Sequence, residues 1–164
     1  MKSIVAVLVA GLGLAGCELP SGLPRFQPTY LFPAEAVSVD VTSQPAMSST
    51  LEDLSDIDEE LSDNVVAGAL VVDVVNPSGA TGQATVRITG GSQTVEGTIL
   101  LSGGDGQRIP AQRAAIQAFL GRTVTIEAQG TFCPATGCGA TQPPFAQVTF
   151  ETKLEITLEI GGEG

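Results

Sequence analysis

Residues 147–160 read QVTFETKLEITLEI, and their side chains alternate between apolar and polar along almost the whole stretch. The apolar set, which Thr152 alone interrupts, is Val148, Phe150, Leu154, Ile156, Leu158 and Ile160. A period of two predicts a β-strand with one face on a core and the other in water. Fourteen residues span about 46 Å, so we expect this strand to bend or bulge, or to pair with different partners along its length. Its outward acidic side chains would blunt it as an edge strand.

The stretches that precede it also predict strands. Residues 65–75 (VVAGALVVDVV) are almost continuously apolar, which indicates a central strand, and the turn signal Asn76-Pro77-Ser78-Gly79 follows them. Alternation starts at Val37 and returns in residues 83–89, 94–101 and 122–132. The loop of residues 90–92 has hairpin length, so residues 83–89 and 94–101 should pair.

Two segments have helical rather than strand spacing. In residues 49–63 (STLEDLSDIDEELSD) the leucines recur at helical intervals, and Ser49 with Glu52 has the form of a capping box. Residues 110–120 (PAQRAAIQAFL) predict a second short helix, with Pro110 in its first turn and Gly121 after its last residue. The chain is therefore predicted to be mainly β: an antiparallel β-sandwich of six to seven strands over residues 37–160, with one or two short accessory helices. Residues 161–164 would form a flexible tail.

The first predicted helix carries a dense group of acidic residues, which raises the question of calcium binding. The spacing and the central glycine of an EF-hand loop are missing, so a solvated acidic face explains the group better than a metal site. Its members are Asp53, Asp56, Asp58, Glu59 and Glu60.

The order of the predicted strands resembles one known family. The stretch ALVVDVVNPSG, followed by a hairpin, a long connection and two more strands, is similar in layout to the late-embryogenesis-abundant group-two domain. Asn76 and Pro77 match the Asn-Pro turn that follows an early apolar strand in that family. The resemblance implies a β-sandwich and no catalytic residues.

The N-terminus has the form of an export signal. Lys2 supplies a positive charge, and the twelve uncharged residues 4–15 fit the apolar segment of a signal peptide but are too short to span a bilayer. Leu14, Ala15, Gly16 and Cys17 then resemble the lipobox of bacterial lipoproteins at every position.

That resemblance implies a lipid anchor. In the family, the cysteine thiol is joined to diacylglycerol, the peptide is cut before the cysteine, and the new amino group is usually acylated, so residues 1–16 would be removed. Two or three acyl chains anchor a protein stably, whereas one is marginal. Glu18 stands where an aspartate would favour the inner membrane, so the resemblance implies outer-membrane sorting if the host is Gram-negative. The alternative is an ordinary signal peptide cut near Ala15 or Gly16, with Cys17 a free thiol.

Residues 17–36 are predicted to be a Pro-rich tether. Prolines recur every four or five residues, at positions 20, 24, 28 and 33, and they disfavour both helix and central strand. An extended tether could lift the domain about 50 Å from the bilayer. Phe26, Tyr30 and Phe32 suggest a second arrangement, in which the later part of the tether docks on the domain.

The charge and the cysteine content limit the classes of partner and ligand that the chain can bind. Loss of residues 1–16 removes Lys2 and leaves six basic against eighteen acidic residues, a net charge of −12. This excess argues against nucleic acid and anionic lipid headgroups, which select basic patches. Cys133 and Cys138 flank a turn-rich loop, and in an exported protein we expect them to form a disulfide. A reduced pair or a metal site are the alternatives, but two cysteines without histidine make a zinc site improbable.

The sequence offers no set of catalytic residues. It contains no histidine, no G-x-S-x-G motif, no P-loop and no tryptophan, so we expect no enzyme activity, no cofactor and no metal. Two classes of function remain. In the first, the chain is a non-catalytic structural or protein-interaction module of the cell envelope, held to the membrane through acyl chains on Cys17, with an unidentified envelope protein as partner. In the alternative, it is a periplasmic carrier that binds a lipid or other apolar ligand inside the sandwich. A filled interior would favour the first class, and a connected apolar cavity of several hundred Å³ the second.

Overall fold

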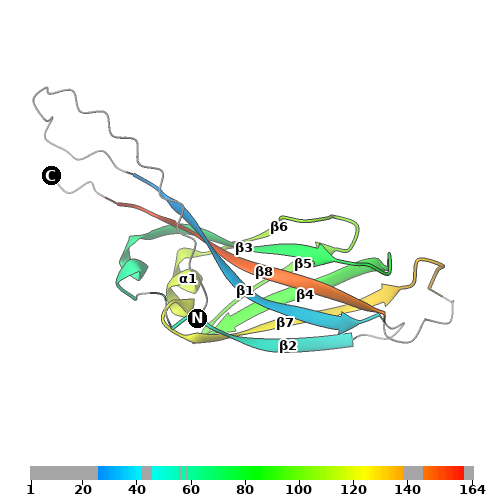
Figure 1. The fold of residues 1–164 in the computed structure, drawn as a ribbon. Helices are drawn as coiled ribbons and strands as arrows, with labels where there is room; N and C mark the ends of the chain where they lie inside the picture. The colour runs from blue at the N-terminus through cyan, green and yellow to red at the C-terminus, as the bar shows by residue number, and fades with distance from the viewer. Residues whose placement is uncertain (1–25, 42–45, 56, 58, 139–145, 161–164) are drawn as a thin grey trace, which may run out of the picture.

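The computed structural model describes residues 26–41, 46–55, 57, 59–138 and 146–160 (Figure 1). These residues form two four-stranded antiparallel sheets that pack face to face, which confirms the predicted mainly-β sandwich. Sheet I has the order β1 (Thr29–Asp40), β8 (Gln147–Leu158), β3 (Val65–Val75) and β6 (Gln107–Ala111). Sheet II has the order β2 (Ala46–Asp53), β7 (Thr123–Cys133), β4 (Thr81–Gly90) and β5 (Gln93–Leu100).

The long alternating stretch becomes β8, and its faces are those that the sequence predicts as far as Leu158, whereas Ile160 lies beyond the strand and is exposed. The apolar positions are buried from Val148 to Leu158, and Thr152 is the one buried polar residue of the described core. The Thr152 hydroxyl donates a hydrogen bond of 2.9 Å to the Glu35 carbonyl oxygen, which satisfies it.

The strand β8 is not at an edge of sheet I. It pairs with β1 on one side and β3 on the other, so its outward acidic residues protect no free edge. The ladders are irregular on the partner strands, between Pro33 and Ala36 of β1 and between Val65 and Ala67 of β3. The predicted irregularity is therefore present, but it lies opposite β8 rather than within it.

The strand β1 begins at Thr29, eight residues before the domain start predicted at residue 37. Pro33 is compatible with this strand because β1 is at the edge of sheet I and the ladder shifts next to Pro33. Phe32 packs against the core, and its ring centroid is 6.4 Å from that of Tyr30. The later part of the predicted tether is thus a strand of the domain.

The helix predicted over residues 49–63 is wrong. Its first half is β2, which pairs with β7 from Ala46 opposite Gly130 to Asp53 opposite Thr123, and its end is the 3-10 helix η1 (Glu59–Asn64). Two causes outweigh the leucine spacing. The ladder with β7 supplies tertiary pairing that local propensity cannot anticipate. The Asp53 carboxylate also accepts a 3.0 Å hydrogen bond from the Ser55 backbone N–H, a local turn that competes with a helix.

The second predicted helix exists but is shorter. It is α1 (Arg113–Phe119), and Gly121 follows it with a φ of +69°, as expected for a helix that ends at glycine. Pro110 is not in its first turn but in β6, a five-residue strand at the edge of sheet I, where a missing N–H donor is tolerated. The sequence pattern predicts neither β2 nor β6. The described residues therefore form eight strands, more than the predicted six to seven.

The core lies between the two sheets, and α1 covers it at one end (Figure 1). Phe132 of β7 and Phe150 of β8 are fully buried, and their ring centroids are 6.3 Å apart. At the same end as α1, β1 and β8 continue beyond the sandwich as a two-stranded ribbon (Figure 1).

Candidate functional site

The lipobox-like residues cannot be placed in space. Leu14, Ala15, Gly16 and Cys17 lie outside the described residues, as do residues 18–25 of the predicted tether and the predicted tail. Their assignment rests on the sequence. In the described part of the chain, no helix has the length and apolar character needed to cross a bilayer.

The cysteine pair is placed as predicted. Cys133 is the last residue of β7, and it forms a disulfide with Cys138, with a Cα–Cα distance of 4.4 Å. The Gly137 N–H donates a 2.9 Å hydrogen bond to the Pro134 carbonyl oxygen and closes the turn between them. A Cβ atom on Gly79 would lie 3.6 Å from that of Ala135, so the disulfide loop lies beside the turn after β3. The bond fixes one end of the sandwich and presents no chemistry of its own.

The acidic residues of the predicted helix do not converge on a site. The side chains of Asp56, Asp58, Glu59 and Glu60 lie outside what the structure describes, and Asp53 is exposed at the end of β2. Among the described side chains there is no group of three or more His, Cys, Asp or Glu placed to hold a metal ion.

The outer face of sheet I carries two ion pairs that join three strands. Both Nη atoms of Arg108 on β6 bond to the Glu155 carboxylate on β8, with Nη1 2.7 Å from Oε2. The Lys153 Nζ of β8 bonds to the Asp73 carboxylate of β3, which also accepts a 2.7 Å hydrogen bond from the Gly106 N–H.

These side chains lie over apolar residues that face outward. Ala69 and Val71 of β3 pair with Glu155 and Lys153 in the ladder and are nevertheless buried. The long stems of lysine and arginine can cover such apolar surface while their charged ends stay in contact with water. The charges on this face thus hold strands together, and their location does not suggest a binding site.

The Lys153–Asp73 pair shifts the titration of both groups. The ion-paired hydrogen bond from Lys153 lowers the pKa of Asp73, and the Gly106 N–H adds to the effect. The same bond raises the pKa of Lys153. A carboxylate with a lowered pKa stabilises the fold above its unfolded pKa of about 3.9, and this contribution is lost as the pH falls through the folded value.

Removal of the Asp73 charge should therefore weaken the fold at neutral pH and matter less in acid. We expect Asp73→Asn to lower the urea midpoint at pH 7 and to have a smaller effect in acid, below the lowered pKa of the folded carboxylate, where the wild-type group is protonated. Lys153→Met breaks the same pair from the other side and keeps the cover over Val71, so it should show the same pH dependence. A difference from wild type that stays constant with pH would contradict the assignment.

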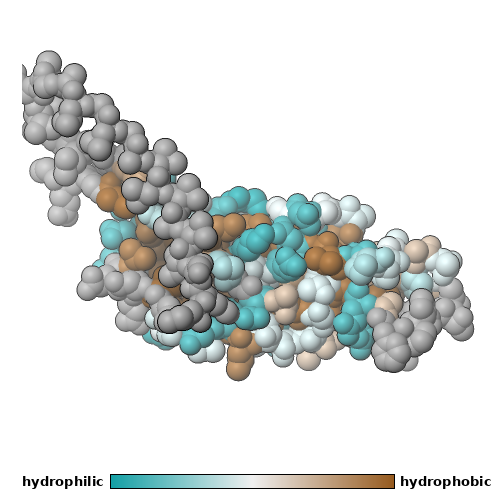
Figure 2. All heavy atoms as spheres, in the orientation of Figure 1, coloured by the Kyte–Doolittle hydropathy of each residue, from teal (hydrophilic) through white to brown (hydrophobic). Residues whose placement is uncertain are grey.

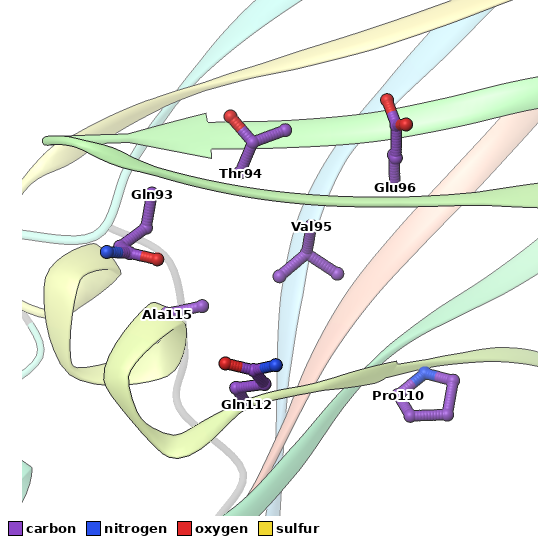
Figure 3. Close-up of a pocket in the computed structure, with 7 residues that line it drawn as sticks. All are labelled: Gln93, Thr94, Val95, Glu96, Pro110, Gln112 and Ala115. Atoms are coloured by element: carbon purple, nitrogen blue, oxygen red, sulfur yellow. The ribbon is translucent and has the colours of Figure 1, made fainter.

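A hollow in the described surface lies between the two sheets, along β5. It has a volume of about 300 Å³ and is open to solvent, and Figure 3 shows the side chains that line it. They are Gln93, Thr94, Val95 and Glu96 of β5, with Pro110 of β6, Gln112 just before α1 and Ala115 of α1 on the other side.

Most of the accessible lining is polar, and its apolar part is small. Val95 and Ala115 are buried, and Val95 points between the sheets, whereas the Thr94 and Glu96 side chains point away to the outer face of sheet II (Figure 3). Gln93 and Gln112 extend toward the hollow from opposite sides (Figure 3). The described residues that line the hollow include no acid–base pair and no nucleophile with a base.

The hollow borders the free edge of β5. In the hairpin with β4 the Leu101 N–H donates to the Gly82 carbonyl oxygen, so odd-numbered residues of β5 bond to β4 and even-numbered ones turn their backbone groups to the other side. At Leu100 a side chain satisfies these outward groups. The Gln107 carboxamide accepts from the Leu100 N–H at 2.9 Å and donates to its carbonyl oxygen at 2.8 Å.

Of the larger exposed apolar side chains, Leu100 lies on β5 and Val66 with Val75 on β3, and the others lie in two groups. Phe26, Tyr30, Leu31 and Ile160 lie at the outer end of the β1–β8 ribbon, and Met47 with Leu51 lies on β2. Figure 2 shows apolar surface at the base of the ribbon and single apolar spots elsewhere on the visible face.

The hollow and the edge were not predicted from the sequence. Residues 94–101 were recognised as a strand, but its place at an edge depends on the order of strands, which the alternation does not encode. The signal that could have located β6 is the short stretch Gln107 to Ala111 between a glycine-rich turn and the helix. Comparison of the chain with protein-family models and with curated proteins gave no match.

Proposed function

We propose that the chain is a lipid-anchored lipoprotein of the cell envelope, and that its β-sandwich is a non-catalytic structural or protein-interaction module. The residues Leu14, Ala15, Gly16 and Cys17 support the anchor, since they have the order that lipoprotein processing requires. The observation that carries the second half of the proposal is the close packing of the interior.

The packing is tight even where glycine leaves the most space. A Cβ atom on Gly68 would lie 2.7 Å from Ile116, and one on Gly130 would lie 2.6 Å from the Phe132 ring. Contacts below 3.0 Å require a neighbour to move, so these side chains already fill the interior at those positions. This supports a module that acts through its surface over a carrier, which would need a connected apolar cavity.

The anchor also sets the location. Glu18 after Cys17 favours outer-membrane sorting in a Gram-negative host. Because the chain is strongly acidic, attraction to anionic headgroups would not hold it at the membrane. The acyl chains on Cys17 then supply the membrane affinity, and the domain reaches its partner in the envelope.

The first test is the Cys17→Ala variant in the native host. We expect wild-type protein in the membrane fraction, with an intact mass of residues 17–164 plus acyl groups that rises by about 2 Da on reduction. Cys17→Ala should move the protein to the soluble fraction, because no acyl chain is left to bury. A double variant with Cys133→Ala and Cys138→Ala should stay on the membrane. A wild-type protein without acyl mass would overturn the anchor.

A second measurement separates the module from the carrier. Native mass spectrometry of the gently extracted wild-type protein reports any lipid held besides the covalent acyl groups. We expect the acylated chain alone. A stoichiometric non-covalent lipid that survives extraction would support the carrier instead.

A further inference from the structure

We propose that the free edge of β5 at Thr94 and Glu96 binds an extended peptide segment of a partner protein by strand addition. A small apolar side chain of the segment would enter the hollow beside Val95, and a lysine or arginine would lie next to Glu96. This inference names the interaction surface of the module described above, and so rests on that function.

The backbone of β5 supplies the first step. The N–H and C=O groups of Thr94 and Glu96 turn away from β4, and they make no backbone hydrogen bond with any other described residue. Hydrogen bonds to free backbone groups of this kind give an added strand its affinity, and the pockets beside the edge give it specificity. The same edge already accepts an amide at Leu100, where the Gln107 carboxamide bonds to both backbone groups. An added strand would continue this pattern along β5.

The hollow supplies the second step. At Gly97 of β5 the sheets are in contact, since a Cβ there would lie 2.7 Å from Ile109, and the hollow borders the preceding residues. In an added strand, the residues opposite Thr94 and Glu96 would place their side chains on the outer face. The residues between them would place their side chains toward Val95, Pro110 and Ala115. Val95, Pro110 and Ala115 supply the apolar part of this lining, and Gln93 with Gln112 can bond to polar groups beside it.

The charge on the outer face supplies the third step and selects the occupant. Arg87 lies between two carboxylates, with its Nη2 2.8 Å from Glu96 and its Nη1 3.7 Å from Glu127. The three side chains Glu96, Arg87 and Glu127 therefore carry a net charge of −1, in a chain that is acidic as a whole. A second copy paired through β5 would bring another Glu96 to the same edge, and like charges across strands destabilise a pair. A cationic residue from a different protein complements these three side chains.

The test uses the full chain with Cys17→Ala, so acylation does not enter it, and failure here leaves the anchoring result intact. The probe is the peptide acetyl-Ser-Val-Lys-Val-Ser-amide at up to about 1 mM, a range that captures weak peptide binding. We expect saturable binding, with amide exchange at Thr94 and Glu96 slowed at least tenfold. The same peptide with glutamate in place of lysine should bind at least tenfold more weakly. Absence of protection at both residues with the lysine peptide would overturn the proposal.

Two N-methylated probes separate strand addition from side-chain binding. One carries N-methyl on the lysine and the other on both valines, and only one of these N–H sets can face β5. We expect one methylated peptide to lose binding and the other to keep it. Loss with the lysine derivative indicates antiparallel addition, and loss with the valine derivative indicates parallel addition. Equal binding of both methylated probes would overturn the proposal.

Two variants of the chain complete the test. Thr94→Pro places a ring on the free edge but removes no hydrogen bond to β4, because the Thr94 N–H points outward. It should abolish peptide binding while the unfolding temperature of the fold remains close to that of wild type. Glu96→Lys should reverse the preference, so that the glutamate peptide binds better than the lysine peptide. A Glu96→Lys chain that still prefers lysine would overturn the assigned charge contact.

Discussion

The Phe150→Ala variant is expected to lose about 3–5 kcal/mol of unfolding free energy, measured by urea denaturation. Phe150 is fully buried in β8, at the centre of sheet I, and its ring faces Phe132 of sheet II. Truncation removes the buried ring surface and leaves a cavity between the sheets that the close packing prevents from collapsing. A domain of this size has about 5–15 kcal/mol in total, so the loss is a large share of its stability.

Two matched variants make this prediction specific. Phe150→Leu keeps most of the volume and should cost far less than the alanine variant, which keeps the series measurable even if Phe150→Ala unfolds. Phe26→Ala removes the same ring from a position that is 65% exposed, and should change stability by no more than about 0.5 kcal/mol. Equal losses at Phe26 and Phe150 would contradict the burial on which the fold rests.

The alternation of β8 is the part of the fold that the sequence specifies best. Its inward series from Val148 to Leu158 is buried as predicted, because a one-residue change of register would expose the whole series. The facing strands β4, β5 and β7 follow the same rule. The polar exception Thr152 is also explained, since a hydroxyl can be buried when a carbonyl oxygen, here that of Glu35, accepts its hydrogen bond.

The errors concern segments whose structure depends on distant partners. Leu51 and Leu54 have helical spacing, but in the structure Leu51 is exposed on β2 and Leu54 is buried beyond its end. The ladder with β7 decides this, and β7 lies about seventy residues later in the chain. The start of β1 is missed for a different reason: the recurring prolines predict a tether up to residue 36, whereas Pro33 is tolerated in a strand at a sheet edge.

The candidate binding edge could not be predicted for a related reason. The sequence of β5 indicates a strand, but a strand becomes a binding edge only if the topology leaves one side unpaired. The assignment depends on β6 ending near Pro110 and on α1 turning away, which together open the hollow next to Thr94 and Glu96. In contrast, the disulfide could be predicted, because Cys133 and Cys138 are close in sequence and flank a turn.

Gly97→Ala should destabilise the fold by about 1–3 kcal/mol, although strand propensity predicts the opposite sign. Alanine is preferred to glycine inside a strand by about 0.5–1 kcal/mol, so a position without steric restraint would gain stability. At Gly97, however, a Cβ would lie 2.7 Å from Ile109 Cγ1 and 2.8 Å from its Cγ2, on the strand that closes this side of the sandwich. The steric cost exceeds the propensity because Ile109 is buried and has little freedom to move.

A double-mutant cycle with Ile109→Ala tests this cause. Ile109→Ala alone should cost about 2–5 kcal/mol, because it removes a buried side chain. In the Ile109→Ala background the Gly97→Ala change should cost nothing or stabilise, since the atoms that oppose the new methyl group are gone. The coupling energy should therefore be at least about 1 kcal/mol and favour the double variant. Additive effects would show that the sheets are not in contact at Gly97, and the hollow next to it would then extend further along β5 than the structure places it.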